Sequence, residues 1–263
     1  NQDLVNKASI QGFGSGPTDP LIANDDAVIS VDVPLKIDVT PSKTWEPGSQ
    51  AFEPGAASTI TIGATQASNV IVDTLVLQDT PTATDGATEL EASNPFRYVD
   101  FAGFTGDPAD SANWPAGATR ALVEVYAFDG SAWTWTEYDA SIADADIAGV
   151  RLSYAGPIEP GATVTQTFGV EQREEDRLGL TTDPSKGYAE TNEVSATVTL
   201  AGQTPVSKNA SAPFTVSPTV IEVRAGKSFV DASGSEVEPL KTVAGNTVHA
   251  ILTAKNEDAP KSA

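Results

Sequence analysis

Short segments in which apolar and polar residues alternate recur along the whole chain, and this pattern constrains the fold more than any other feature. They occupy residues 28–33, 58–64, 70–77, 120–128, 149–154, 163–170, 193–200, 219–223 and 247–254. They are rich in Val, Ile, Thr and aromatic residues, and Pro, Gly, Asp and Asn separate them. Because no helical pattern intervenes, we expect an all-β fold, an immunoglobulin-like antiparallel β-sandwich with long irregular connections.

Local signals refine this expectation. Asp129 and Gly130 stand between two alternating runs, residues 121–128 and 132–138, which predicts a tight β-hairpin. Residues 142–147 and 171–178 are the only weakly helical stretches, each a turn or two long. The segment 80–115 is poor in strand patterns, so we expect a long irregular connection there.

An internal repeat appears when residues 1–68 are laid against residues 187–257. Asn6 then matches Asn192, and Lys43 matches Lys227. The repeat predicts three parts: residues 1–33 are the last strands of one module, residues 34–217 are a complete module, and residues 218–263 are the first strands of the next. Half-sandwiches have exposed edges, so we also expect the ends to pair, within one chain or head to tail between chains.

The composition restricts the partners. The chain has 36 acidic and 15 basic residues, a formal charge of −21, which disfavours nucleic acid and anionic lipid. No apolar run approaches the roughly 18 residues that a membrane-spanning helix needs, so no membrane insertion is expected. The absence of cysteine excludes disulfides, thiolate metal sites and cysteine nucleophiles.

The sequence also lacks a recognisable catalytic constellation. The single histidine, His249, has no serine or acid at a spacing that suggests a triad or a zinc site. The glycine-rich stretch 12–16 has no helix after it, as a phosphate-binding loop would require. We therefore expect the chain not to be an enzyme.

The two copies share a strand pattern Asn-x-(Ala/Val)-Ser, an Asn-bearing link (residues 24–28 and 209–212), and then a first strand with a lysine. These features resemble the tandem immunoglobulin-like repeats of large Gram-positive cell-surface proteins of the adhesin and pilin-stalk type. The resemblance implies an extracellular, cell-surface protein whose partners are the neighbouring repeats, and a structural role in a stalk or in adhesion.

The resemblance further implies an amide cross-link between a first-strand lysine and a late-strand asparagine, promoted by a buried acid. Lys43 and Asn192 occupy these places in the complete repeat, and Lys227 and Asn6 occupy them in the flanking repeats. The acid is Asp73, Asp79 or Asp100, a choice that the sequence leaves open. The alternative is that these lysines and asparagines are ordinary solvated strand and turn residues.

Acidic turns offer a possible calcium site. Asp139, Asp144 and Asp146 lie close together in the sequence, and calcium takes several oxygen ligands from such loops. They do not fit the twelve-residue calcium loop, and Asp is also a common turn former. No other cofactor is expected.

Two tryptophans offer a possible ligand surface. Trp133 and Trp135 alternate onto one face of the predicted hairpin, where indole rings could stack on sugars or pack into a core. The leading function is thus a stalk or adhesion module without turnover chemistry. The alternatives are a self-assembling surface-layer or filament subunit joined by strand exchange, and an adhesin domain that binds a host or cell-surface glycan or protein.

Overall fold

The computed structural model describes residues 2–12, 21–31, 33–177, 187–217, 223–231, 233–237, 241 and 243–256, with side chains from residue 33 onward except at 223, 255 and 256. Nearly all regular structure is β. The strands are β1 (Gln2–Gly12), β2 (Leu21–Val31), β3 (Val39–Glu46), β4 (Ser49–Ala51), β5 (Ala57–Gln66), β6 (Val72–Asp79), β7 (Val99–Thr105), β8 (Arg120–Phe128), β9 (Trp133–Glu137), β10 (Ile147–Ile158), β11 (Thr163–Gln172), β12 (Tyr188–Thr199), β13 (Val206–Ser217), β14 (Val223–Val230) and β15 (His249–Asn256). Three short 3-10 helices are η1 (Pro95–Arg97), η2 (Ser111–Asn113) and η3 (Asp144–Asp146).

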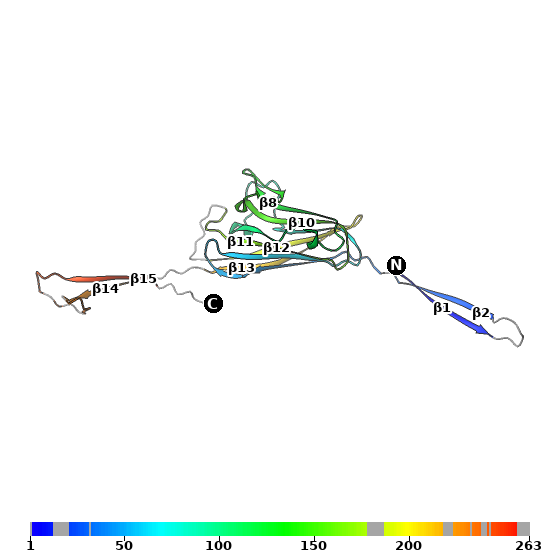
Figure 1. Cartoon of the computed structure of the whole chain (residues 1–263), viewed down its shortest axis with the longest axis horizontal. Helices are drawn as coiled ribbons and strands as arrows, with labels where there is room; N and C mark the ends of the chain where they lie inside the picture. Colours follow the sequence, from blue (N-terminus) through cyan, green and yellow to red (C-terminus); the bar gives the residue numbers. More distant parts are fainter. Residues whose placement is uncertain are drawn as a thin grey trace.

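The central part of the chain is a two-layered β-sandwich. One layer has seven strands in the order β4-β13-β12-β6-β10-β8-β9, and the other has four in the order β3-β5-β11-β7. All pairs are antiparallel except β4 with β13, which are parallel and depart from the predicted arrangement. Figure 1 shows the strands stacked between the two ends of the chain.

Alternation builds the core, as the sequence pattern predicts. In β5, the buried residues Ser58, Ile60 and Ile62 alternate with Ala57, Thr59 and Thr61, which are exposed or half-buried. Ile60 and Ile62 are fully buried. In the facing layer, Leu75 and Leu77 of β6 are also fully buried. Burying such side chains is worth about 1.5–3 kcal/mol each, so the two inner faces supply the main driving force for folding.

The expected and observed elements differ in a few places. The segment 80–115 contains β7, η1 and η2, which its many turn residues conceal. The helical stretch at 142–147 is reduced to η3, and residues 171–172 of the other belong to β11. Residues 219–222 of the predicted strand 219–223 lie outside the described residues, and β14 begins at Val223.

The long connection after β6 covers the outer face of the β8–β9 hairpin. The Tyr126 hydroxyl donates to the carbonyl of Thr84 at 2.7 Å. The Trp133 amide donates to the carbonyl of Ala87 at 2.7 Å. This part of the connection therefore caps an aromatic cluster on the outer face of the hairpin, whose buried members Tyr126 and Trp133 are continuous with the hydrophobic core.

Two separate hairpins precede and follow the sandwich in the chain, β1 with β2 and β14 with β15, and Figure 1 draws them apart from it. Their registers match hairpins of the sandwich. Asn6 pairs with Ala27 as Asn192 pairs with Ala212. Lys227 pairs with Leu252 as Lys43 pairs with Ile62.

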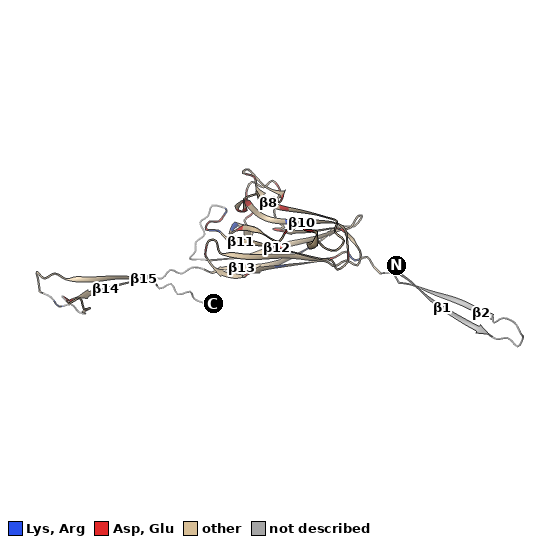
Figure 2. Ribbon diagram, viewed as in Figure 1, with Lys and Arg blue, Asp and Glu red and all other residues tan. Residues whose placement is uncertain are grey.

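Charged residues lie mainly outside the sheet interior. Figure 2 shows largely uncharged strands, with acidic positions in the loops beside β8 and a mixed acidic and basic group near the end of β11. Among the described residues, no helix has the length and apolar character needed to cross a bilayer.

Candidate cross-linking site

Strand alternation places a lysine and an asparagine at core positions. In β3, Val39, Lys43 and Trp45 face inward, and Lys43 stands opposite Ile62 of β5. In β12, Asn192 and Val194 face inward from the other layer, so both polar side chains point into the space between the sheets. Because β3 packs against β12 and β13, this space is shared by the first and the last strands of the sandwich.

Asp79 lies between the lysine and the asparagine. The Nζ atom of Lys43 is 2.7 Å from Oδ1 of Asp79, and both side chains are 0% exposed. The contact is an ion pair at short range whose angles do not satisfy hydrogen-bond geometry. Nδ2 of Asn192 donates to Oδ2 of the same carboxylate at 3.4 Å. One carboxylate thus contacts both of its buried neighbours.

Aromatic side chains cover one side of the site. Trp45 of β3 stacks on Phe214 of β13 with ring centroids 4.4 Å apart and planes inclined by 11°. Phe214 is two residues from Ala212, the register partner of Asn192. Asn192 is itself 0% exposed, and its Oδ1 has no hydrogen-bond partner in the described structure. An unsatisfied buried carbonyl is costly, which makes this amide an unusual feature of a core.

Burial acts against the charged form of Lys43. Burial lowers the pKa of Lys43, because an ammonium ion loses its hydration, and the nearby Asp79 carboxylate partly opposes that shift. A buried ion pair recovers its desolvation cost only when its geometry is very good. Among the described residues, Asp79 is the one carboxylate in contact with Nζ, so the Lys43 ammonium has little to compensate its loss of hydration.

The structure shows which of the three candidate acids lies at the site, a choice that the sequence left open. Only Asp79 lies beside Lys43 and Asn192. Asp73 is exposed at the start of β6, where its Oδ2 accepts from the Ala201 amide at 2.6 Å. Asp73 is therefore not placed to act on either residue, since its side chain is used in a surface turn.

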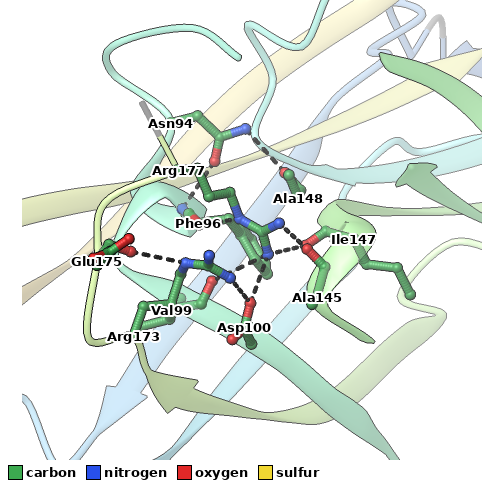
Figure 3. A network of polar contacts seen from close by, with 10 residues as sticks. All are labelled: Asn94, Phe96, Val99, Asp100, Ala145, Ile147, Ala148, Arg173, Glu175 and Arg177. Carbon is green, nitrogen blue, oxygen red and sulfur yellow. Dashed lines mark hydrogen bonds and ion pairs between the residues drawn. The ribbon is translucent and has the colours of Figure 1, made fainter. Parts of the chain in front are cut away.

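Asp100, in β7, belongs to an arginine network that lies just after the end of β11. Figure 3 shows that Arg173 and Arg177 both point at its carboxylate. Arg177 also donates to main-chain carbonyls of three segments, those of Phe96, Val99, Ala145 and Ile147. Burial lowers the pKa of Arg177 to about 10, with the positive charge of Arg173 adding to the effect. This network joins η1, β7 and the start of β10, which is a structural role.

The flanking positions have no comparable environment in the described residues. Lys227 is exposed on β14, with Nζ 5.3 Å from the centre of the Phe229 ring. The side chain of Asn6 lies outside the described residues. The cross-link predicted for these two positions stays a prediction.

The two tryptophans do not form an open pair. Trp133 is only 7% exposed and packs against Tyr126 at a centroid distance of 5.6 Å. Trp135 lies under the Arg151 guanidinium, 4.4 Å from its ring centre, and Arg151 pairs with Glu124. Both indoles therefore belong to the cluster on the outer face of the hairpin, where other side chains cover them.

The three predicted calcium ligands do not converge. Within the described part of the chain, no group of three acidic or other metal-binding side chains has the geometry to hold an ion. The Asp139 carboxylate instead accepts from the backbone and hydroxyl of Ser141, which lowers its pKa. Asp144 and Asp146 lie at the two ends of η3 and are exposed.

Sequence reasoning did not find two residues that border the site. Thr80 directly follows Asp79 and is 3% exposed, and Gly149 of β10 lies against it. The Thr80-Pro81 dipeptide marks the end of a strand. Nothing in the local sequence, however, indicates which buried group that strand end would approach.

The described arrangement defines a β-sandwich with a buried Lys-Asp-Asn set that joins its two layers. No family model matches the chain, and no curated protein matches it. Among solved structures it is similar to the Bacillus cereus major pilin subunit BcpA in its D312A form, at TM-score 0.40 and 13% identity over 94% of this chain and 63% of that chain.

Two adhesin structures show weaker similarity. The N-terminal domain of the Streptococcus gordonii adhesin Sgo0707 gives a TM-score of 0.36 and 10% identity, over 69% of this chain and 33% of that chain. The collagen-binding subdomain of the Enterococcus faecalis surface protein ACE gives 0.29 and 6%, over 71% and 99%. These neighbours are thus pilin and adhesin domains of bacterial surfaces.

Proposed function

We propose that this chain is a force-transmitting module of an extracellular bacterial surface stalk or adhesin, and that an amide bond between Lys43 and Asn192 locks its sandwich. The proposal rests on one observation. A lysine, a carboxylate and an asparagine lie together, fully buried, between the two sheets, with one contact of 2.7 Å and one of 3.4 Å at the shared carboxylate. Such a set is costly as a purely structural feature, but it is suited to forming a bond.

The groups supply each step of the reaction. Transfer of a proton from Lys43 to Asp79 makes the amine a nucleophile and the acid a hydrogen-bond donor. Rotation of the Asn192 carboxamide then turns its unpaired Oδ1 toward the acid, which polarises the carbonyl. Nζ attacks Cγ, and Nδ2 leaves as ammonia with a proton from the lysine. Because the amide product carries no charge, it removes the cost of the buried ion pair.

The position of the bond supports a mechanical role. Lys43 lies in the first strand of the sandwich and Asn192 in the strand before the last. Tension applied where the chain enters β3 and leaves β13 would therefore pass through the amide bond. Residues 44–191 would be bypassed and could not extend, while the sandwich would still transmit force along the chain.

The matching registers of the flanking hairpins support a tandem arrangement. The face of β14–β15 that carries Lys227 also carries Leu252, which is 77% exposed, whereas its register equivalent Ile62 is 0% exposed. An apolar side chain so exposed indicates a surface that lacks its covering layer. We propose that the neighbouring repeats, with strands equivalent to β12 and β13, are the partners that cover it.

Intact mass spectrometry tests the cross-link. The wild-type chain is expected to weigh about 17 Da less than its sequence predicts, because one ammonia is lost per bond. Digestion should yield one branched peptide that joins the segments around Lys43 and Asn192. The variants Lys43→Ala and Asp79→Ala should have the full sequence mass.

Two controls make the result specific. Lys208→Ala removes an exposed lysine that pairs with Asp38, and Asp73→Ala removes the acid that lies away from the site; both should keep the mass deficit. A wild-type chain of full mass after prolonged incubation of the folded protein would exclude the cross-link.

A further inference from the structure

Thr80 has a backbone conformation that its side chain disfavours. Among the described residues other than glycine, it alone has a positive φ, at 64°. For a β-branched residue this left-handed conformation is a true outlier and is strained. The strain lies directly after Asp79, the central group of the candidate cross-linking site.

The contacts of Thr80 connect the two strands that carry the site. Its amide donates to the carbonyl of Glu193 at 3.2 Å, and Glu193 follows Asn192. Its hydroxyl donates to the carbonyl of Asp79 at 2.6 Å. These two bonds hold the peptide that links Asp79 to Thr80, and so limit how far the Asp79 carboxyl can move relative to Asn192.

The neighbouring strand β10 leaves room for this turn at Gly149. A Cβ atom at Gly149 of β10 would lie 2.5 Å from the Thr80 hydroxyl and 3.2 Å from the Asp79 carbonyl oxygen. Any other residue would therefore push against the hydroxyl or the strand end. Gly149 leaves the space that the hydroxyl of Thr80 fills.

The turn also leaves a gap beside Asn192. Pro81 has no amide hydrogen and cannot continue the ladder, so β6 ends at Asp79 while β12 runs on to Tyr188. A pocket of about 130 Å³ lies where β6 would have continued. Its walls include Thr80, Pro81 and Thr82 on one side and Asn192 on the other. It has room for a molecule as small as ammonia or water.

We infer that Thr80 is a positioning residue for amide formation and that this pocket is the exit for the released ammonia. The inference rests on the proposed cross-link. The Nζ–Cγ bond forms and the Cγ–Nδ2 bond breaks. The proton lost by Nζ passes through Asp79 to the departing nitrogen, and ammonia leaves through the pocket. The strained turn both holds the acid and keeps β6 from covering the leaving group.

The test is the rate of ammonia loss in the full chain made by cell-free synthesis and sampled by intact mass over time. Thr80→Val keeps the shape of the side chain but loses the hydroxyl, and it should slow bond formation about tenfold or more, since small displacements of reacting groups have large kinetic effects. Thr80→Ser keeps the hydroxyl and should react like wild type. Near-ultraviolet circular dichroism confirms that each variant is folded.

A second variant tests the exit without altering Asp79. Thr82→Trp, at an exposed position on the pocket wall, should fill the opening and slow the mass change, whereas Thr204→Trp in an exposed turn should not. A merely structural role for Thr80 would lower the melting temperature but leave the rate unchanged.

The outcomes separate the two proposals. Folded Thr80→Val reacting at the wild-type rate overturns the positioning role, and Thr82→Trp reacting at that rate overturns the exit. If Thr80→Val does not fold, Gly149→Ala tests the positioning role by the same measurement, because its Cβ would displace the Thr80 hydroxyl. A slower loss of ammonia in the folded Gly149→Ala protein supports the role, and the wild-type rate overturns it. A wild-type chain that never loses ammonia refutes the cross-link itself.

Discussion

The hairpins β3–β5 and β14–β15 have the same lysine register but opposite environments. Lys43 stands opposite Ile62 and both are buried, whereas Lys227 stands opposite Leu252 and both are exposed. The difference arises from what covers each hairpin. Strands β6, β12 and β13 lie over the first and bring Asp79 and Asn192 to the lysine. A lysine on a β-hairpin is therefore removed from water only when a second layer of strands covers it, which is the condition that the proposed cross-link requires.

The largest expected difference between the two regions is in extension under force. If the amide forms, residues 44–191 cannot unravel, and at about 3.4 Å per residue some 500 Å of contour length is missing when the sandwich is pulled. The β14–β15 hairpin should extend fully. Single-molecule stretching of the wild-type chain and of Lys43→Ala measures this. Equal unfolding lengths in the two proteins would show that the sandwich is not locked.

The next comparison concerns two equivalent apolar positions. Ile62→Ala should cost about 2–5 kcal/mol of unfolding free energy, because it leaves a cavity in a fully buried core. Leu252→Ala should change it by less than about 0.5 kcal/mol, since that side chain is 77% exposed.

Urea unfolding measures both effects, and the Lys43→Ala background keeps an amide bond from masking them. A large loss for Leu252→Ala in the isolated chain would mean that its hairpin is already covered, in contradiction to the exposure of Leu252.

The smallest expected effect on stability concerns Asp38 and its two exposed lysine partners, Lys36 and Lys208. Hydrogen bonds from Lys208 and Lys36 lower the pKa of Asp38 to about 2. Because its folded pKa is below its unfolded value of about 3.8, its contribution is present above pH 4 and disappears as the pH falls toward 2. The pairs are exposed, so the contribution should be below about 1 kcal/mol.

Acid titrations of wild type and Asp38→Asn measure this term. The two curves should converge near pH 2 and differ slightly above pH 4. High salt should reduce the difference, since exposed ion pairs are screened. A difference that persists unchanged in high salt would place the pair in a less solvated environment than that of an exposed surface.

Sequence patterns predicted much of the sandwich, because burial of alternate side chains has the same period as a strand. The hairpin at Asp129-Gly130, the strands β10 and β11, and the inward positions of Ile60 and Ile62 follow from such patterns. The strand β7 was hidden, because Asp100 and Gly103 interrupt its apolar residues with turn formers. Its pairing with β11 overrides that local preference.

Sequence patterns identified only some residues of the candidate site. Repetition singled out Lys43 and Asn192, but Asp73, Asp79 and Asp100 could not be told apart by their neighbours in the chain. Their roles depend on which strand end lies under which layer: Asp73 turns to a surface loop, Asp100 meets two arginines, and Asp79 meets the lysine. The strained conformation of Thr80 is likewise a consequence of contacts with distant strands.

By itself the sequence determined the class of fold, the residues that face inward and the recurrence of a lysine and an asparagine, since these follow from local periodicity. Tertiary structure alone decided which acid joins them, how dry their surroundings are and which lysine remains in water. The physical reason is that hydration and electrostatic energy depend on separation in space, and residues 43, 79 and 192 come together only when the two sheets close.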